Sequence, residues 1–165
     1  MDSLEVYSEI FIGFVGFSGI VAALGVRNDN KWSKVDKNRF ILLIGCSFSG
    51  VFFSLIPQII QHYIVDQKTA WQLALSLIGT CMIIAISAVF YFFLRTGTLH
   101  HPDFSKRFMS TAGTILFTYS SVALLAALDI YFEASFGIYA IGLMCVMLIS
   151  AGMFSLLVRL ILKDA

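Results

Sequence analysis

Five long apolar runs, separated by short polar segments, make up most of this chain. They cover residues 10–26, 40–62, 71–94, 108–128 and 136–162. Each is close to the ~20 residues that a helix needs to cross the hydrocarbon core of a bilayer. Because unpaired backbone groups are costly in lipid, runs of this length are expected to be helical. The pattern predicts an all-α polytopic bundle with five transmembrane helices in a single integral membrane domain, residues 1–165.

Two of the five runs need a closer look. The first is short and rich in glycine, which suffices for a span if the bilayer thins or the helix sits in a bundle. Its flank MDSLEVYSE carries three carboxylates and no base, whereas a signal peptide has a basic start, so we expect a retained helix. The second run contains Pro57, and this helix either ends there or continues with a kink through Gln58, Gln61 and His62.

The basic residues are distributed very unevenly between alternate connections. All Lys and Arg residues except Lys68 fall after the first and third runs or at the end of the fifth, where Arg159 and Lys163 lie. Basic residues concentrate on the cytoplasmic side of membrane proteins, so we predict an outside N-terminus and a cytoplasmic C-terminus. The acids of the other side are Asp2, Glu5, Glu9, Asp66, Asp129 and Glu133. The protein is therefore expected to have an acidic outer face and a basic inner face.

Composition agrees with this membrane interpretation. Hydrophobic residues make up 59% of the chain and charged residues only 13%, whereas an average soluble domain is roughly 25% charged. This excludes a soluble catalytic or nucleotide-binding domain. Small size and short connections favour a bacterial inner (plasma) membrane as the location.

Acidic and hydroxyl residues suggest a path for ions. Glu9, Asp129 and Glu133 are expected at the outer surface, where an acidic mouth would concentrate cations. A hydroxyl stripe follows one face of the fourth run: Thr111, Thr114, Thr118 and Ser121. These hydroxyls could line a wet path, bond across helices or bond back to their own backbone. The leading hypothesis is a small ion channel or pore.

Small residues mark two helix faces as contacts with protein. On the first run they are Gly13, Gly16, Gly19 and Ala23, and on the second Gly50 and Ser54. Small side chains let helix backbones approach closely in a membrane. Because these faces exceed what one chain can bury, we predict a homo-oligomer.

The segment between the first two runs supplies the alternative function. Its basic and aromatic residues are Arg27, Lys31, Trp32, Lys34, Lys37 and Arg39. This pattern suits anionic lipid headgroups or an acidic partner surface, although topology alone also explains it. The alternative is a membrane scaffold or sensor subunit that recruits a soluble cytoplasmic protein. Nucleic-acid binding is not expected, since so short a loop contains no folded reader.

The sequence has no strong catalytic or cofactor motif. Cys46, Cys81 and Cys145 lie far apart inside apolar runs, without the spacing of a dithiol or zinc site. The adjacent His100 and His101, with Asp103, lie in a short connection that assures no metal geometry. There is no nucleophile elbow and no phosphate-binding glycine loop. We therefore predict no enzyme, no cofactor and no metal site.

Overall fold

The computed structural model describes the backbone of residues 2–27, 33–97 and 105–163, with side chains at 4–20, 33, 35–97 and 105–159. This part of the chain forms five helices: α1 (Asp2–Arg27), α2 (Lys34–Tyr63), α3 (Gln67–Thr96), α4 (Lys106–Ala127) and α5 (Phe136–Lys163). The predicted all-α fold is therefore confirmed, and each helix contains nearly all of one of the predicted apolar runs.

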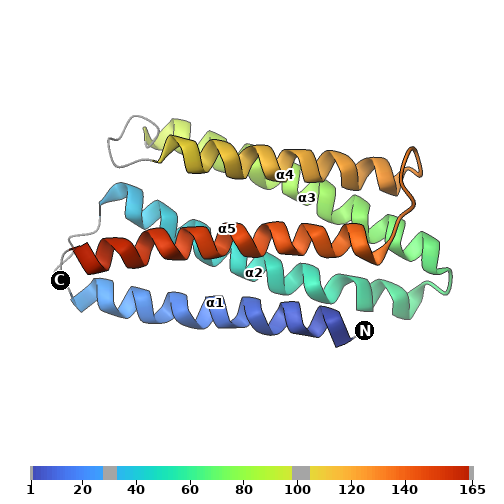
Figure 1. Ribbon diagram of the computed structural model, residues 1–165, viewed down its shortest axis with the longest axis horizontal. Helices are drawn as coiled ribbons and strands as arrows, with labels where there is room; N and C mark the ends of the chain where they lie inside the picture. The colour runs from blue at the N-terminus through green and yellow to red at the C-terminus, as the bar shows by residue number, and fades with distance from the viewer. Residues whose placement is uncertain (1, 28–32, 98–104, 164–165) are drawn as a thin grey trace.

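The helices run up and down along one long axis (Figure 1). One end of the bundle holds the start of α1 and the α2–α3 and α4–α5 connections; we call it the acidic end, after Glu5, Glu9, Asp66, Asp129 and Glu133. The other holds the starts of α2 and α4; we call it the basic end, after Lys37, Arg39, Arg95, Lys106, Arg107 and Arg159. The helices thus separate the two signs of charge by the length of a membrane span.

Local sequence signals set the helix ends. Ser33 caps α2, because its Oγ accepts a hydrogen bond from the Asp36 backbone N–H at 3.2 Å. Asp66 caps α3, accepting from the Thr69 N–H at 3.0 Å. The Thr69 hydroxyl also donates to the Asp66 carboxylate, and the hydrogen bonds from the Thr69 hydroxyl and N–H hold the pKa of this carboxyl below its ordinary value. Gly97 ends α3 with φ 67°, a left-handed conformation that glycine adopts without strain.

The second helix continues through Pro57, which resolves the question left open by the sequence. Proline has no backbone N–H, so the Phe53 carbonyl one turn earlier loses its usual partner. In this structure the Tyr139 hydroxyl of α5 donates to that carbonyl at 2.6 Å, and the bond is buried. A side chain from another helix therefore replaces the bond that Pro57 removes.

Four helices are long and apolar enough to cross a membrane, over Val35–Tyr63, Gln67–Thr96, Lys106–Ala127 and Phe136–Arg159. On its described residues α1 is not among these four. Large apolar side chains also cover the outside of the bundle, among them Phe48, Phe52, Ile84, Phe117, Ile141 and Leu148. An apolar outer surface of this extent needs a lipid or protein environment. The predicted integral membrane class is supported by these features.

The buried core differs between the two ends. Toward the acidic end, one continuous cluster joins all five helices and includes Phe11, Ile56, Leu75, Ala123 and Tyr139. Toward the basic end there are two smaller clusters, one around Leu43, Met153 and Leu157 and one around Val35 and Phe93. The interior of the basic half is thus divided.

Candidate functional site

An apolar cavity of about 460 Å³ lies where the core is divided. We call it the four-helix cavity, because residues of α2, α3, α4 and α5 line it. The lining residues are Leu42, Cys46, Ala85, Ile86, Val89, Phe90, Phe93, Lys106, Met109, Ser110, Ala112, Gly113, Leu116, Ile149 and Met153. Its volume is within the ~300–1,000 Å³ range of pockets that bind small molecules.

The course of α3 explains why this space exists. In Figure 1, α3 begins beside the end of α2 and finishes beside the start of α4. The α3–α4 pair therefore diverges from α2 and α5 toward the basic end. Small residues at Ala85, Ala112 and Gly113 line the opened space, and an added Cβ at Gly113 meets no atom within 4 Å. The cavity reaches the surface of the bundle at Phe90 and Ser110, which are exposed.

Charge is confined to one end of this cavity. Lys106 is the one charged residue among its described lining residues, and it is exposed at the start of α4. Leu116 lines the cavity ten positions further along, a distance of ~15 Å at 1.5 Å per residue. The cavity therefore runs from the basic end to about half the ~30 Å thickness of a hydrocarbon core.

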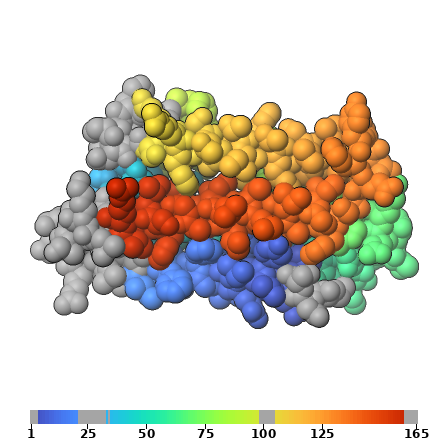
Figure 2. All heavy atoms as spheres, viewed as in Figure 1, coloured from blue at the N-terminus to red at the C-terminus, as the bar shows by residue number. Residues whose placement is uncertain are grey.

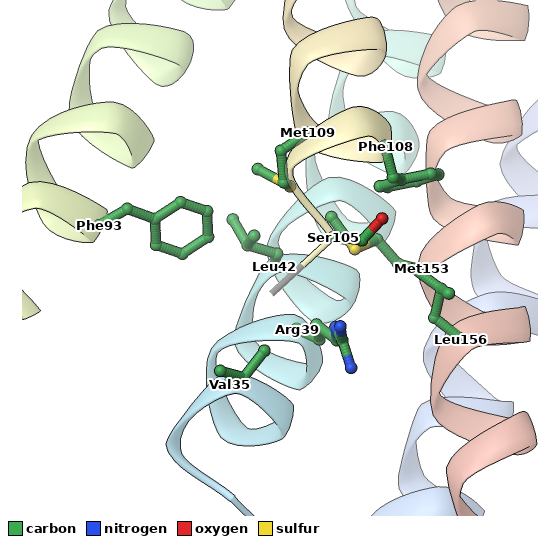
Figure 3. Close-up of a pocket in the computed structure, with 9 residues that line it drawn as sticks. All are labelled: Val35, Arg39, Leu42, Phe93, Ser105, Phe108, Met109, Met153 and Leu156. Atoms are coloured by element: carbon green, nitrogen blue, oxygen red, sulfur yellow. The ribbon is translucent and has the colours of Figure 1, made fainter. Parts of the chain in front are cut away.

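A second, very small pocket adjoins the four-helix cavity at the basic end (Figure 3). It holds about 10 Å³, room for about one water molecule, and shares Leu42, Phe93, Met109 and Met153 with the larger space. Arg39 and Ser105 are its polar residues. The Arg39 Nη1 donates to the Asp36 carboxylate at 2.9 Å, so an ion pair lies beside the small pocket that adjoins the four-helix cavity.

The acidic residues proposed for an outer mouth are all exposed, but on different helices or connections. Asp129, which follows α4 with φ 60°, forms an ion pair with Lys68 of α3. Glu133 and Lys68 line a further pocket of about 400 Å³ at this end, to which α1 contributes no described residue. Glu9 is exposed on α1. The structure thus brings Lys68 together with Asp129 and Glu133, and leaves Glu9 outside this group.

The hydroxyl stripe of α4 lies away from the core and the four-helix cavity. Thr111, Thr114 and Thr118 are exposed, and Ser121 is half-buried. The hydroxyls of Thr111 and Thr114 donate to backbone carbonyls one turn earlier, at 2.9 Å each, and Ser121 does the same at 3.0 Å. None of the four residues lines the four-helix cavity. Any polar path along this face would lie outside a single copy of the chain.

The proposed packing residues fall into two groups. Gly50 and Ser54 are buried in α2, and the Phe11 ring lies within 2.4 Å of where a Cβ on Gly50 would be. An added Cβ at Gly13, Gly16 or Gly19 of α1 meets nothing within 4 Å. The side chain of Ala23 lies outside the described residues. Other glycines, missed by the sequence argument, receive large side chains: Leu124 packs on Gly79, Tyr119 on Gly142 and Phe108 on Gly152.

Much of the basic segment between α1 and α2 lies outside the described side chains, including Arg27, Lys31, Trp32 and Lys34. Of the rest, Lys37 is exposed and Arg39 is half-buried in its ion pair with Asp36. The His100, His101 and Asp103 cluster also lies outside the described residues. Among those that are described, no group of three His, Cys, Asp or Glu side chains could hold a metal ion.

The fold and the four-helix cavity define a class: an all-helical protein with four described helices that are long and apolar enough to cross a membrane, and an apolar cavity between them. Comparison with known proteins found no matching family model, no matching curated protein and no matching solved structure. Its function must therefore be inferred from the site itself.

Proposed function

We propose that this protein binds the apolar chain of a membrane amphiphile in the four-helix cavity. The observation that carries the proposal is the cavity itself: about 460 Å³, lined almost wholly by apolar side chains and open at the surface of a membrane bundle. Its entrance beside exposed Phe90 would face lipid chains. An acyl chain could thus enter sideways, without crossing the polar headgroup region.

Neither an empty nor a water-filled cavity is a good alternative. An enclosed void costs about 24 cal/mol per Å³, so leaving the buried part of this space empty would be destabilising. Water needs two to four polar partners, and the lining offers few besides Ser110 and Lys106. Hydrocarbon needs no such partners and regains the missing dispersion contacts.

We also propose that α1 is a fifth span and that the acidic end lies outside the cell. The support is the separation of charge: every described Lys and Arg except Lys68 lies at the basic end. A reporter that is active only in the cytoplasm, fused after residue 165, should be active. An inactive C-terminal fusion together with an active N-terminal one would contradict this orientation.

Photo-crosslinking tests whether a lipid acyl chain binds in the four-helix cavity. The protein is reconstituted in vesicles that contain a phospholipid with a photoactivatable group midway along one acyl chain, and labelled peptides are mapped by mass spectrometry. We expect label on the lining segments 85–93 and 109–116. Gly113→Leu should fill the cavity and reduce this label, because a Cβ at Gly113 has open space.

The matched control is Gly45→Leu. Gly45 also has open space around an added Cβ, but it lies on an exposed part of α2 and does not line the cavity. Label that is equally strong in the Gly113→Leu and Gly45→Leu proteins would contradict lipid binding in the cavity. So would lipid label that falls only outside the lining segments 85–93 and 109–116.

A pore between copies is the second candidate, favoured by the exposed hydroxyl face of α4. Figure 2 shows α4 and α1 on opposite sides of α5, so Glu9 and the α4 hydroxyls could share a path only between neighbouring copies. Head-to-tail contacts of this kind form a ring when the rotation between successive copies closes. We expect a ring of identical subunits in native mass spectrometry and ion flux in liposomes that falls with Glu9→Gln. A monomer that passes no ions would reject the pore.

A further inference from the structure

We infer that the amphiphile is an anionic phospholipid of the leaflet at the basic end, with one acyl chain in the four-helix cavity and its headgroup at Lys106. This inference rests on the proposed function and assigns the chemical class of the ligand. It starts from the position of Lys106, the one charged residue among the described lining residues.

The length of the cavity selects the leaflet. Along α4 it extends from Lys106 to Leu116, ~15 Å, and along α3 from Phe93 back to Ala85, ~12 Å. Each distance is about half of a hydrocarbon core, or the depth of one leaflet. The acidic half contains the continuous core around Leu75, Ala123 and Tyr139. The pocket at that end lies among Lys68, Glu133 and the starts of α3 and α5, so it does not offer an acyl chain an apolar space that extends along the helices.

Charge at the cavity mouth selects the headgroup. Lys106 can lay its aliphatic stem along the apolar mouth and hold its ammonium at the interface. Arg107 follows it, and the first turn of α4 contains no acid. The positive end of the α4 dipole points to the same place, and Ser105 makes no side-chain capping bond there. No described carboxylate forms an ion pair with Lys106, whereas Arg39 is paired with Asp36. A phosphate diester with a neutral or acidic headgroup complements this mouth.

The other occupants fit less well. A zwitterionic lipid would bring an ammonium group toward Lys106 and Arg107, and the repulsion would reduce its affinity. An apolar helix of a second copy would leave the Lys106 ammonium without a counter-charge at the mouth. A zwitterionic occupant predicts no enrichment of the anionic lipid, and a second copy predicts that Gly113→Leu leaves the amount of retained lipid unchanged.

Retained lipid measures the preference directly. The full chain is reconstituted in vesicles of equal phosphatidylglycerol and phosphatidylcholine, extracted in mild detergent, and its bound lipid is quantified by mass spectrometry. We expect phosphatidylglycerol to be enriched. Lys106→Gln should lower the phosphatidylglycerol-to-phosphatidylcholine ratio about fivefold, the effect of one basic residue at a membrane surface.

Two further variants make the result specific. Arg107→Gln removes a neighbouring exposed charge that does not line the cavity, and it should lower the ratio less than Lys106→Gln does. Lys106→Arg keeps the charge and should keep the enrichment. An equal effect of Lys106→Gln and Arg107→Gln would overturn the inference, because it would show attraction to the surface in general.

The outcome for Gly113→Leu separates this inference from the proposed function. If Gly113→Leu lowers the total retained lipid while the wild-type protein shows no preference for phosphatidylglycerol, the proposed binding of an acyl chain is supported and the headgroup assignment fails. If Gly113→Leu retains as much lipid as the wild type, both fail. Loss of lipid in Gly113→Leu together with loss of preference in Lys106→Gln supports both.

Discussion

The acidic and basic halves of the bundle are built from the same four apolar helices, yet only the acidic half is closely packed. In the packed half two glycines of the apolar helices receive large partners: Gly142 receives the Tyr119 ring and Gly79 receives Leu124. In the basic half Ala85, Ala112 and Gly113 line a cavity that no side chain of the described chain fills. At the basic end Gly152 does receive the Phe108 ring, so the contrast concerns the small residues of α3 and α4: Gly79 is closely packed, whereas Ala85 and Gly113 border open space.

The ion pairs differ in the opposite sense. In the open half, Asp36 and Arg39 form a largely buried pair, with 3% and 13% of their side chains exposed. In the packed half, Lys68 and Asp129 are paired at the surface, with 55% and 38% exposed. A buried pair matters to stability when one partner is removed, whereas an exposed pair contributes little. The pair in the open half lies within α2, whereas the pair in the packed half joins α3 to the α4–α5 connection.

The largest expected effect comes from the same substitution made in the two halves. Gly142→Leu forces a side chain into the position of the Tyr119 ring, 2.2 Å from the new Cβ, and should lower the free energy of unfolding by about 3 kcal/mol. Gly113→Leu enters the cavity and should lower it far less or raise it. Denaturation in mixed detergent micelles measures both. An equal loss at the two glycines would break the contrast between the halves.

Removing one partner of the buried pair should have the next largest effect. Asp36 is only 2% exposed, and Arg39→Gln removes the ion partner of its carboxylate. We expect the free energy of unfolding to fall by about 2 kcal/mol in the same assay. Lys68→Gln is the control at the acidic end and should cause a smaller loss, since that pair is exposed. A larger loss of unfolding free energy for Lys68→Gln would show that the exposed pair, and not the buried one, contributes more to stability.

A smaller effect is expected where Tyr139 completes the Pro57 turn. Tyr139→Phe leaves the Phe53 carbonyl without its donor and should cost about 1 kcal/mol. In a Pro57→Ala background the helix regains its own N–H donor, so the same change should cost less. A double-mutant cycle measures this coupling. Additive effects would show that the hydroxyl does not replace the missing backbone bond.

The smallest effect is expected at the Asp66 cap of α3. Its pKa is lowered in the folded protein by hydrogen bonds from Thr69, so the carboxylate stabilises the helix above the unfolded pKa of about 3.9. That contribution should disappear as pH falls through the lowered folded pKa. Asp66→Asn should remove part of this acid sensitivity in a stability titration. If Asp66→Asn leaves the loss of stability at low pH unchanged, another group is responsible for that loss.

The sequence by itself determined the helices, their approximate ends and the separation of charge along the bundle. Apolar run length gives a helix in lipid whatever its neighbours are, because the backbone must satisfy its own hydrogen bonds. Capping residues such as Ser33 and Asp66 act locally, and the basic residues could be assigned by counting. These features depend on short stretches of chain, so a pattern along the sequence contains them.

The tertiary structure decided what the small and polar residues contact. Helical spacing placed Gly13 and Gly50 in similar stripes, yet Gly50 receives the Phe11 ring while Gly13 meets nothing within 4 Å. Ala85, Ala112 and Gly113 gave no signal, because three small residues on two helices line a cavity only if those helices diverge from α2 and α5. The partner of the Phe53 carbonyl that Pro57 leaves without its helical donor is Tyr139, which lies 82 positions after Pro57 in the chain. Such outcomes follow from how the helices pack against one another, which no single run of sequence specifies.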